Sequence, residues 1–236
     1  MIVALHVWRL PAYGVPAALL RVARDHLTLG RTPNLRFGKV LGTGDGTTFT
    51  PRDATPRRWA LLTVWDSAAD ADGFERSGTV GRWDTAAQER WRILLTPLSA
   101  RGRWSRRTPF GQPEPSRHEG PVAALTRARI APRTWATFWR AVPPVSADLH
   151  RCDGLLLALG IGEAPIGLQG TFSLWRSGGD LTAFAHRRGP HVEAIRRTAT
   201  ERWYAEELFA RFAVVCASGR VEGRDPLAGM VGAAPP

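Results

Sequence analysis

The sequence repeats itself at a spacing close to half its length. A Trp, Asp and Phe pattern recurs 110 residues further along the chain, at Trp65 and Trp175, Asp70 and Asp180, and Phe74 and Phe184. Two more matches lie in the same order: residues 89–91 (Glu-Arg-Trp) recur at 201–203, and the Leu-Gly-x-Gly of 41–44 recurs at 159–162. Because such matches in one order are hard to obtain by chance, the chain is predicted to contain two halves of similar plan.

Hydrophobic periodicity predicts the same order of elements in each half, namely strand, helix, strand, strand, helix, strand. In the first half we expect strands near 2–9, 35–42, 59–65 and 97–104, and helices near 14–28 and 67–92. In the second half we expect strands near 121–129, 154–161, 168–175 and 210–217, and helices near 132–141 and 178–208. Ser67 and Ser177 each precede a predicted helix and have Asp three residues later, a pattern typical of helix capping.

This order is the split βαβ arrangement of a ferredoxin-like unit, so the predicted fold class is α+β with two such units in tandem. One unit alone leaves a face of its sheet bare, and two copies should therefore cover each other or form a barrel. We place the first half at 1–104, a proline-containing linker at 105–120, the second half at 121–217 and a flexible Gly, Ala and Pro-rich tail at 218–236.

Composition narrows the functional classes only partly. The net charge of +11 suggests nucleic acid or an anionic surface, but the charge is spread along the chain and every basic residue except Lys39 is arginine. The one tight cluster is Arg101, Arg103, Arg106 and Arg107. Two distant cysteines, no signal peptide and no long apolar run favour a soluble, cytoplasmic protein with at most peripheral membrane contact.

Two residues stand out as candidates for chemistry. His191 follows Gly189-Pro190, which is typical of a helix start, and a position in the first turn favours the neutral imidazole that a metal ligand requires. Packing or capping is the alternative for this histidine, because no second histidine lies at a metal-binding spacing. Lys39 is the only lysine, so a compact ammonium is either required there or retained by chance.

Several blocks of the chain resemble the spheroidene monooxygenase family of carotenoid biosynthesis. The resemblance rests on Phe37 to Gly44, Phe49-Thr50-Pro51, Leu94 to Phe110, Gly120 to Ala128, Gly160 to Glu163, Thr171 to Trp175 and Trp203 to Phe212. It covers nearly the whole chain except the tail. It implies a dimeric α+β barrel fold within one chain, a haem b cofactor and oxidation of an apolar substrate such as an acyclic carotenoid.

The resemblance also implies roles for individual residues. It places a histidine at His191, which would be the axial ligand of the haem iron. Our own hypothesis adds Trp175 and Phe184 as apolar walls, and Arg187 and Arg196 as partners of the haem propionates. Lys39 would supply a proton or a charge on the distal side. A reduced ferredoxin would provide the electrons.

Three other hypotheses remain open from the sequence. A haem enzyme of the same fold could act on an N–O or N–N substrate in natural-product biosynthesis, by dehydration or N–N bond chemistry. Tandem ferredoxin-like units with a basic pI also describe a pair of RRM modules, although the strands at 60–65 and 170–175 lack the aromatic pattern that binds RNA. The third hypothesis is a scaffold that has lost its cofactor.

Overall fold

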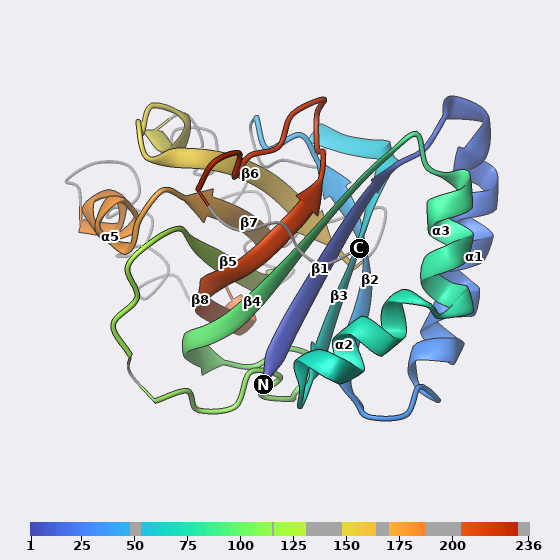
Figure 1. Ribbon diagram of the computed structural model, residues 1–236, viewed down its shortest axis with the longest axis horizontal. Coiled ribbons are helices and arrows are strands. Elements are labelled where there is room, and N and C mark those ends of the chain that lie inside the picture. The colour runs from blue at the N-terminus through green and yellow to red at the C-terminus, as the bar shows by residue number, and fades with distance from the viewer. Residues whose placement is uncertain (48–52, 115, 131–147, 164–169, 187–203, 231–236) are drawn as a thin grey trace.

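A computed structural model of the chain describes residues 1–47, 53–114, 116–130, 148–163, 170–186 and 204–230. In these residues, eight strands form one closed barrel in the order β1-β3-β2-β6-β7-β5-β8-β4, and each neighbouring pair is antiparallel. Helices lie outside the barrel on two sides (Figure 1). The α+β class and the expected barrel are therefore confirmed.

The elements of the first half are β1 (Ile2–Arg9), the short 3-10 helix η1 (Ala12–Gly14), α1 (Val15–Leu29), β2 (Leu35–Gly44), β3 (Ala54–Trp65), α2 (Ala68–Glu75), α3 (Gly78–Ala86) and β4 (Glu89–Gly102). Those of the second half are β5 (Val122–Ile130), β6 (Leu155–Gly162), β7 (Gly170–Trp175), α5 (Gly178–His186) and β8 (Tyr204–Gly219). Within each half the strands are ordered fourth, first, third, second, so the described parts of the two halves share one arrangement.

Two seams join the halves. At the first, β2 pairs with β6 around Thr43 and Ile161. At the second, β4 pairs with β8 over a long register that begins with Trp91 opposite Gly219 and ends with Gly102 opposite Leu208. Because both seams are hydrogen-bonded ladders, the sheet closes on itself and leaves no edge strand among the described residues.

The inside of the barrel is an apolar core to which all eight strands contribute. Side chains alternate along each strand, as at Trp91, Ile93 and Leu95 of β4, all of which are almost fully buried. The turns after β4 and β8 add Trp104, Phe110, Val221 and Leu227 to the same core. The interior is therefore packed with side chains from the strands and from these two turns.

The outer faces of the two halves carry their own cores. In the first half, the large side chains of Trp8, Trp59, Trp65 and Trp83 lie among α1, α2, α3 and the sheet. In the second half, α5 packs on a smaller cluster that includes Trp175. The backbone N–H groups of Asp70 and Asp180 donate to Ser67 and Ser177 at 3.1 Å, which confirms the predicted helix caps.

Two predicted helices differ from the structure. The predicted helix 67–92 is two helices that end at Ala86, and its last residues belong to β4. The predicted helix 178–208 ends at His186 in the described part, and β8 already begins at Tyr204. The strand pattern prevails because residues 89–95 and 204–208 hydrogen-bond with neighbouring strands, and such pairing cannot be read from local periodicity. The helix predicted at 132–141 lies outside the described residues.

The predicted tail and linker are also corrected. Ser218 and Gly219 belong to β8, and Val221 and Leu227 are each only 1% exposed within the barrel core, so the described part of 218–236 is built into the fold. In the predicted linker, Phe110 is 1% exposed and contacts Phe212. Phe110, Val221 and Leu227 therefore complete the core at the ends of the barrel. A sequence pattern does not predict this burial, because the space that these side chains fill exists only once the barrel has closed.

Candidate functional site

Four charged side chains meet inside one end of the barrel. The four residues are Lys39 of β2, Arg127 of β5, Glu163 just after β6 and Glu206 of β8. Each lies two positions along the chain from an apolar residue of the barrel core, as Lys39 does from Phe37 and Leu41. We call these four residues the interior ionic cluster. Each strand places its member inward because alternate residues face the same side.

Glu163 is the centre of the interior ionic cluster. Its Oε2 accepts from Lys39 Nζ at 2.7 Å, and its Oε1 accepts from Arg127 Nη2 and Trp104 Nε1, each at 2.7 Å. Lys39 also donates to Ser105 Oγ at 2.9 Å. Burial raises the pKa of Glu163, but the hydrogen bonds and charges of Lys39 and Arg127 outweigh it and hold that pKa below its usual range.

Glu206 connects the interior ionic cluster to the turn after β4. Its carboxylate accepts the backbone N–H of Ser105 at 3.0 Å and of Arg106 at 2.7 Å, and it pairs with Arg127. Burial raises the pKa of Glu206, and these N–H groups with the Arg127 guanidinium lower it by more. The positive charges of Lys39 and Arg127 are therefore balanced by the negative charges of Glu163 and Glu206. These contacts join three strands and a turn, so they stabilise this end of the barrel.

The sequence predictions single out Lys39 but miss its partners. Arg127 is 4% exposed at its side chain although it lies on a strand whose other inward residues, Ala123 and Leu125, are apolar. A charged residue at an inward position of an alternating strand is the signal that could have indicated a buried ion pair. The partner could not be named in advance, because Glu163 comes from a strand on the other side of β7.

A second region of interest is the outer face of the second half. Cross-strand pairing aligns small side chains in two rows, Ala158 with Ser173 and Ala124, and Gly160 with Thr171 and Thr126. We call these six residues the small-residue face. Trp175 and Phe184 lie beside it with ring centroids 5.3 Å apart, and Trp175 Nε1 donates to Ser173 Oγ at 2.9 Å.

The predicted site residues therefore separate into two places. Trp175 and Phe184 lie together on the outer face of the second half. Lys39 faces the barrel interior, on the opposite side of the sheet, and its ammonium is engaged by Glu163 and Ser105. His191, Arg187 and Arg196 lie outside the described residues. Their predicted roles remain predictions.

No group of three or more His, Cys, Asp or Glu side chains in the described ranges is arranged to hold a metal ion. The described histidine that is most buried, His6, is 0% exposed, donates a hydrogen bond from Nε2 to the carboxylate of Glu75 and stacks on Trp8. Glu75 also pairs with Arg90 and Arg92. This group lies between β1, β4 and α2 and ties α2 to the sheet.

The barrel places the chain in a known structural class. The architecture matches the aldoxime dehydratases: one crystal structure gives a TM-score of 0.58 at 10% identity, with 99% of this chain and 88% of that chain covered. A second, in complex with butyraldoxime, gives 0.52 at 11% identity, with 90% of this chain and 79% of that chain covered. At such low identity the likeness shows the α+β barrel fold.

Sequence comparison then gives the family. Curated proteins named spheroidene monooxygenase are 38% identical over 221 residues in Rhodobacter capsulatus, covering 92% of this chain and 91% of the relative, and 39% identical over 194 residues in Rubrivivax gelatinosus, covering 81% and 73%. The Cereibacter sphaeroides relative is 36% identical, with 88% of this chain and 64% of the relative covered. No family model matches the chain. The chain belongs to the spheroidene monooxygenase family, which confirms the resemblance and indicates an oxidoreductase.

Proposed function

We propose that this protein is a haem-dependent monooxygenase that oxidises an apolar substrate, an acyclic carotenoid. The observation that carries the proposal is the identity of 36% to 39% with three proteins named spheroidene monooxygenase over most of the chain. This relationship favours monooxygenation over the N–O and N–N chemistry, RNA-binding and cofactor-free hypotheses.

The small-residue face fits a flat cofactor. Its residues are Ala, Gly, Ser and Thr, which have short side chains or none, so a planar group placed against them would lie close to the sheet, and Trp175 and Phe184 would border it on one side. Phe184 lies on α5, which ends at His186, only five residues before His191. The chain thus leaves α5 beside this face, which supports His191 as the axial ligand. Residues Arg187 and Arg196 would pair with the propionates.

Bound haem would activate dioxygen, and the protein would position the substrate and exclude water from the site. Val122, Trp175 and Phe184 present hydrocarbon that excludes water from the outer face, and Ser173 fixes the indole of Trp175 through its hydroxyl. Insertion of one oxygen atom leaves the other to become water, which consumes two electrons and two protons. We assign the electrons to a reduced ferredoxin and the reaction to the cytoplasmic compartment.

Lys39 enters this proposal as a residue that fixes the barrel. The ammonium of Lys39 is hydrogen-bonded inside the barrel, and the sheet separates it from the small-residue face, so a direct distal proton donation is not part of the mechanism we favour.

We further propose that the two halves of the chain arose by a tandem ferredoxin-like duplication. Two observations support this: the halves share one strand order, and the pattern Gly-Arg-x-x-x-Arg-x-Pro occurs at 102–109 and again at 219–226.

The visible spectrum of protein from haem-replete cells tests the cofactor, with His191→Ala measured beside it. Soret absorption in the wild type and altered ligation in the variant are expected. Absence of Soret absorption would refute the haem proposal, whereas an unchanged variant would refute only the axial assignment and leave His186 as the next candidate.

Incubation with an acyclic carotene, dioxygen and reduced ferredoxin should give an oxygenated product. Turnover of an aldoxime without reductant would instead support the N–O alternative.

A further inference from the structure

Helix α1 exposes apolar side chains on the face that points away from the protein. Its buried positions, Ala18, Asp25 and Leu29, share one side of the helix. On the opposite side lie Leu20 and Leu27, which are 75% and 69% exposed, and Tyr13 of η1 precedes them at 87%. A helix that is apolar on both sides is usually covered on both. The outward side of α1 therefore calls for a partner.

Arginines surround these apolar side chains without neutralising carboxylates. Arg24 and Arg31 are exposed and make no ion pair with another described residue. The one carboxylate of α1 belongs to Asp25, which is 0% exposed and accepts from Trp83 Nε1 at 2.7 Å and Arg82 Nη2 at 3.0 Å. The outward surface of α1 is thus both apolar and positive.

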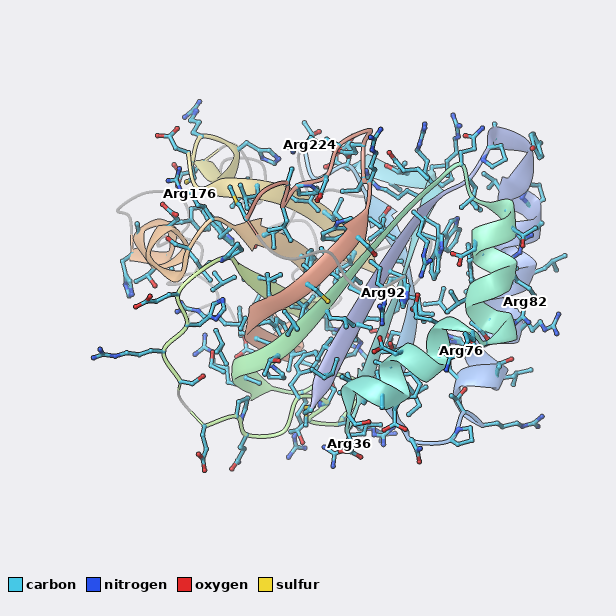
Figure 2. The ribbon with its side chains drawn as sticks, viewed as in Figure 1. Arg36, Arg76, Arg82, Arg92, Arg176 and Arg224 are labelled. Atoms are coloured by element: carbon cyan, nitrogen blue, oxygen red, sulfur yellow. The ribbon has the colours of Figure 1, made fainter. Side chains whose placement is uncertain are left out.

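A groove runs beside these residues, between α1 and the start of α3. It has a volume of about 560 Å³ and is lined by Arg24, Leu27, Arg31, Phe74 and Arg82, together with the first residues of α3. Arg82 is anchored there by Asp25 and Thr79, and Figure 2 shows it on α3 at the edge of the molecule. The guanidinium groups of Arg24 and Arg31, which make no ion pair with a described residue, lie beside a hollow with apolar lining residues, and this combination matches a phosphate that carries hydrocarbon.

We infer that this surface, formed by Tyr13, Leu20, Arg24, Leu27, Arg31 and Arg82, binds the surface of an anionic phospholipid bilayer. The leucines and the tyrosine enter the boundary between headgroups and acyl chains, Arg24 and Arg31 pair with lipid phosphates, and Arg82 borders the groove. The inference goes beyond the proposed function, because it concerns a side of the protein opposite α5 (Figure 1) and needs no cofactor. It supplies attachment to the phase in which an apolar substrate dissolves.

Vesicle co-sedimentation of the full chain tests this inference directly. Vesicles of phosphatidylcholine containing one-third phosphatidylglycerol should pellet the protein at low salt, and pure phosphatidylcholine or high salt should weaken binding strongly. Removing both charges in Arg24→Gln/Arg31→Gln should weaken binding roughly 25-fold, about five-fold per arginine. Leu20→Gln/Leu27→Gln should weaken it by more than about tenfold.

The matched control is Arg103→Gln/Arg107→Gln, which removes the same charge from the exposed turn after β4. The control should bind nearly as the wild type does, and circular dichroism should show all variants folded. Equal loss in the control would overturn the inference, since only net charge would then matter. So would absence of vesicle binding, or light scattering that shows a dimer which Leu20→Gln/Leu27→Gln turns into monomers. None of these outcomes depends on haem or on turnover.

Discussion

Lys39 and Glu163 form an ion pair of 2.7 Å inside the barrel, close to the seam where β2 meets β6. The side chains are 17% and 28% exposed, so neither charge is fully hydrated. Removal of one partner from such a pair leaves a poorly solvated charge. The pair therefore contributes to holding the two halves together.

Replacing Lys39 with Met should lower the free energy of unfolding by about 2 kcal/mol, below the range for fully buried pairs because water reaches this one. Glu163→Gln should cost a similar amount. The double variant should lose less than the sum of the single losses, with a coupling of about 1 kcal/mol in urea denaturation. Strict additivity would show that the pair does not stabilise the barrel.

The free energy of unfolding should fall in acid because several carboxyl groups have a lower pKa in the folded protein than in the unfolded chain. The ion pairs and hydrogen bond of Glu75 with His6, Arg92 and Arg90 outweigh burial and lower its pKa from 4.5 to about 2. A lowered folded pKa means that the unfolded chain binds more protons below about pH 4.5. The contribution of ionised Glu75 to the stability of the fold is therefore complete above about pH 4.5 and is lost as the pH falls toward 2.

Denaturation of the wild type between pH 5 and pH 2.5 should show this slope, with roughly 2 kcal/mol attributable to Glu75. Glu75→Gln should be less stable at pH 7 and should have a shallower dependence on pH in the same window. An unchanged slope in this variant would contradict the assignment to Glu75. Glu163, whose pKa is also lowered, should add to the wild-type slope.

Glycine is required at the position where β8 passes into its closing turn. Gly219 has a φ of +86°, and a Cβ there would lie 2.2 Å from the carbonyl oxygen of Arg90. Gly219→Ala should therefore destabilise the protein by about 2 kcal/mol or more. Gly81→Ala is the control, because a Cβ at this helical position in α3 meets nothing within 4 Å. The control should stabilise by about 0.5 kcal/mol, and thermal melting compares the two.

The two cysteines should differ in reactivity. Burial raises the pKa of Cys216, whereas Cys152 is only partly buried. Native protein should therefore react with a maleimide at one thiol, and Cys152→Ser should abolish that labelling, as mass spectrometry would show. Labelling of Cys216 at the native rate in the variant would mean that β8 opens readily.

Filling the small-residue face should prevent haem binding without unfolding the protein. Ala124→Leu adds three carbons on the β5 side of this face, whereas the control Val215→Leu enlarges a side chain that is 48% exposed on β8. The first variant should lose most of its haem after expression in haem-replete cells, and the control should retain it. Equal haem content in folded preparations would place the cofactor elsewhere.

Local sequence was sufficient for the elements whose pattern is local. The strand at Ile2–Arg9 and the helix at Val15–Leu29 agree with prediction within a residue or two, and the Ser67 and Ser177 caps form as expected. The long predicted helices failed at 89–92 and 204–208. There the strand state depends on partners far along the chain.

By itself, the sequence determined the α+β class, the prominence of Lys39 and the family. Only the tertiary structure decided that Lys39 faces Glu163 and Arg127 inside the barrel, while Trp175 and Phe184 lie on the outer side of the sheet. The physical reason is that a period of two tells which residues share a face of a strand. It does not tell which face turns inward or which strands become neighbours, because closure of the barrel fixes both.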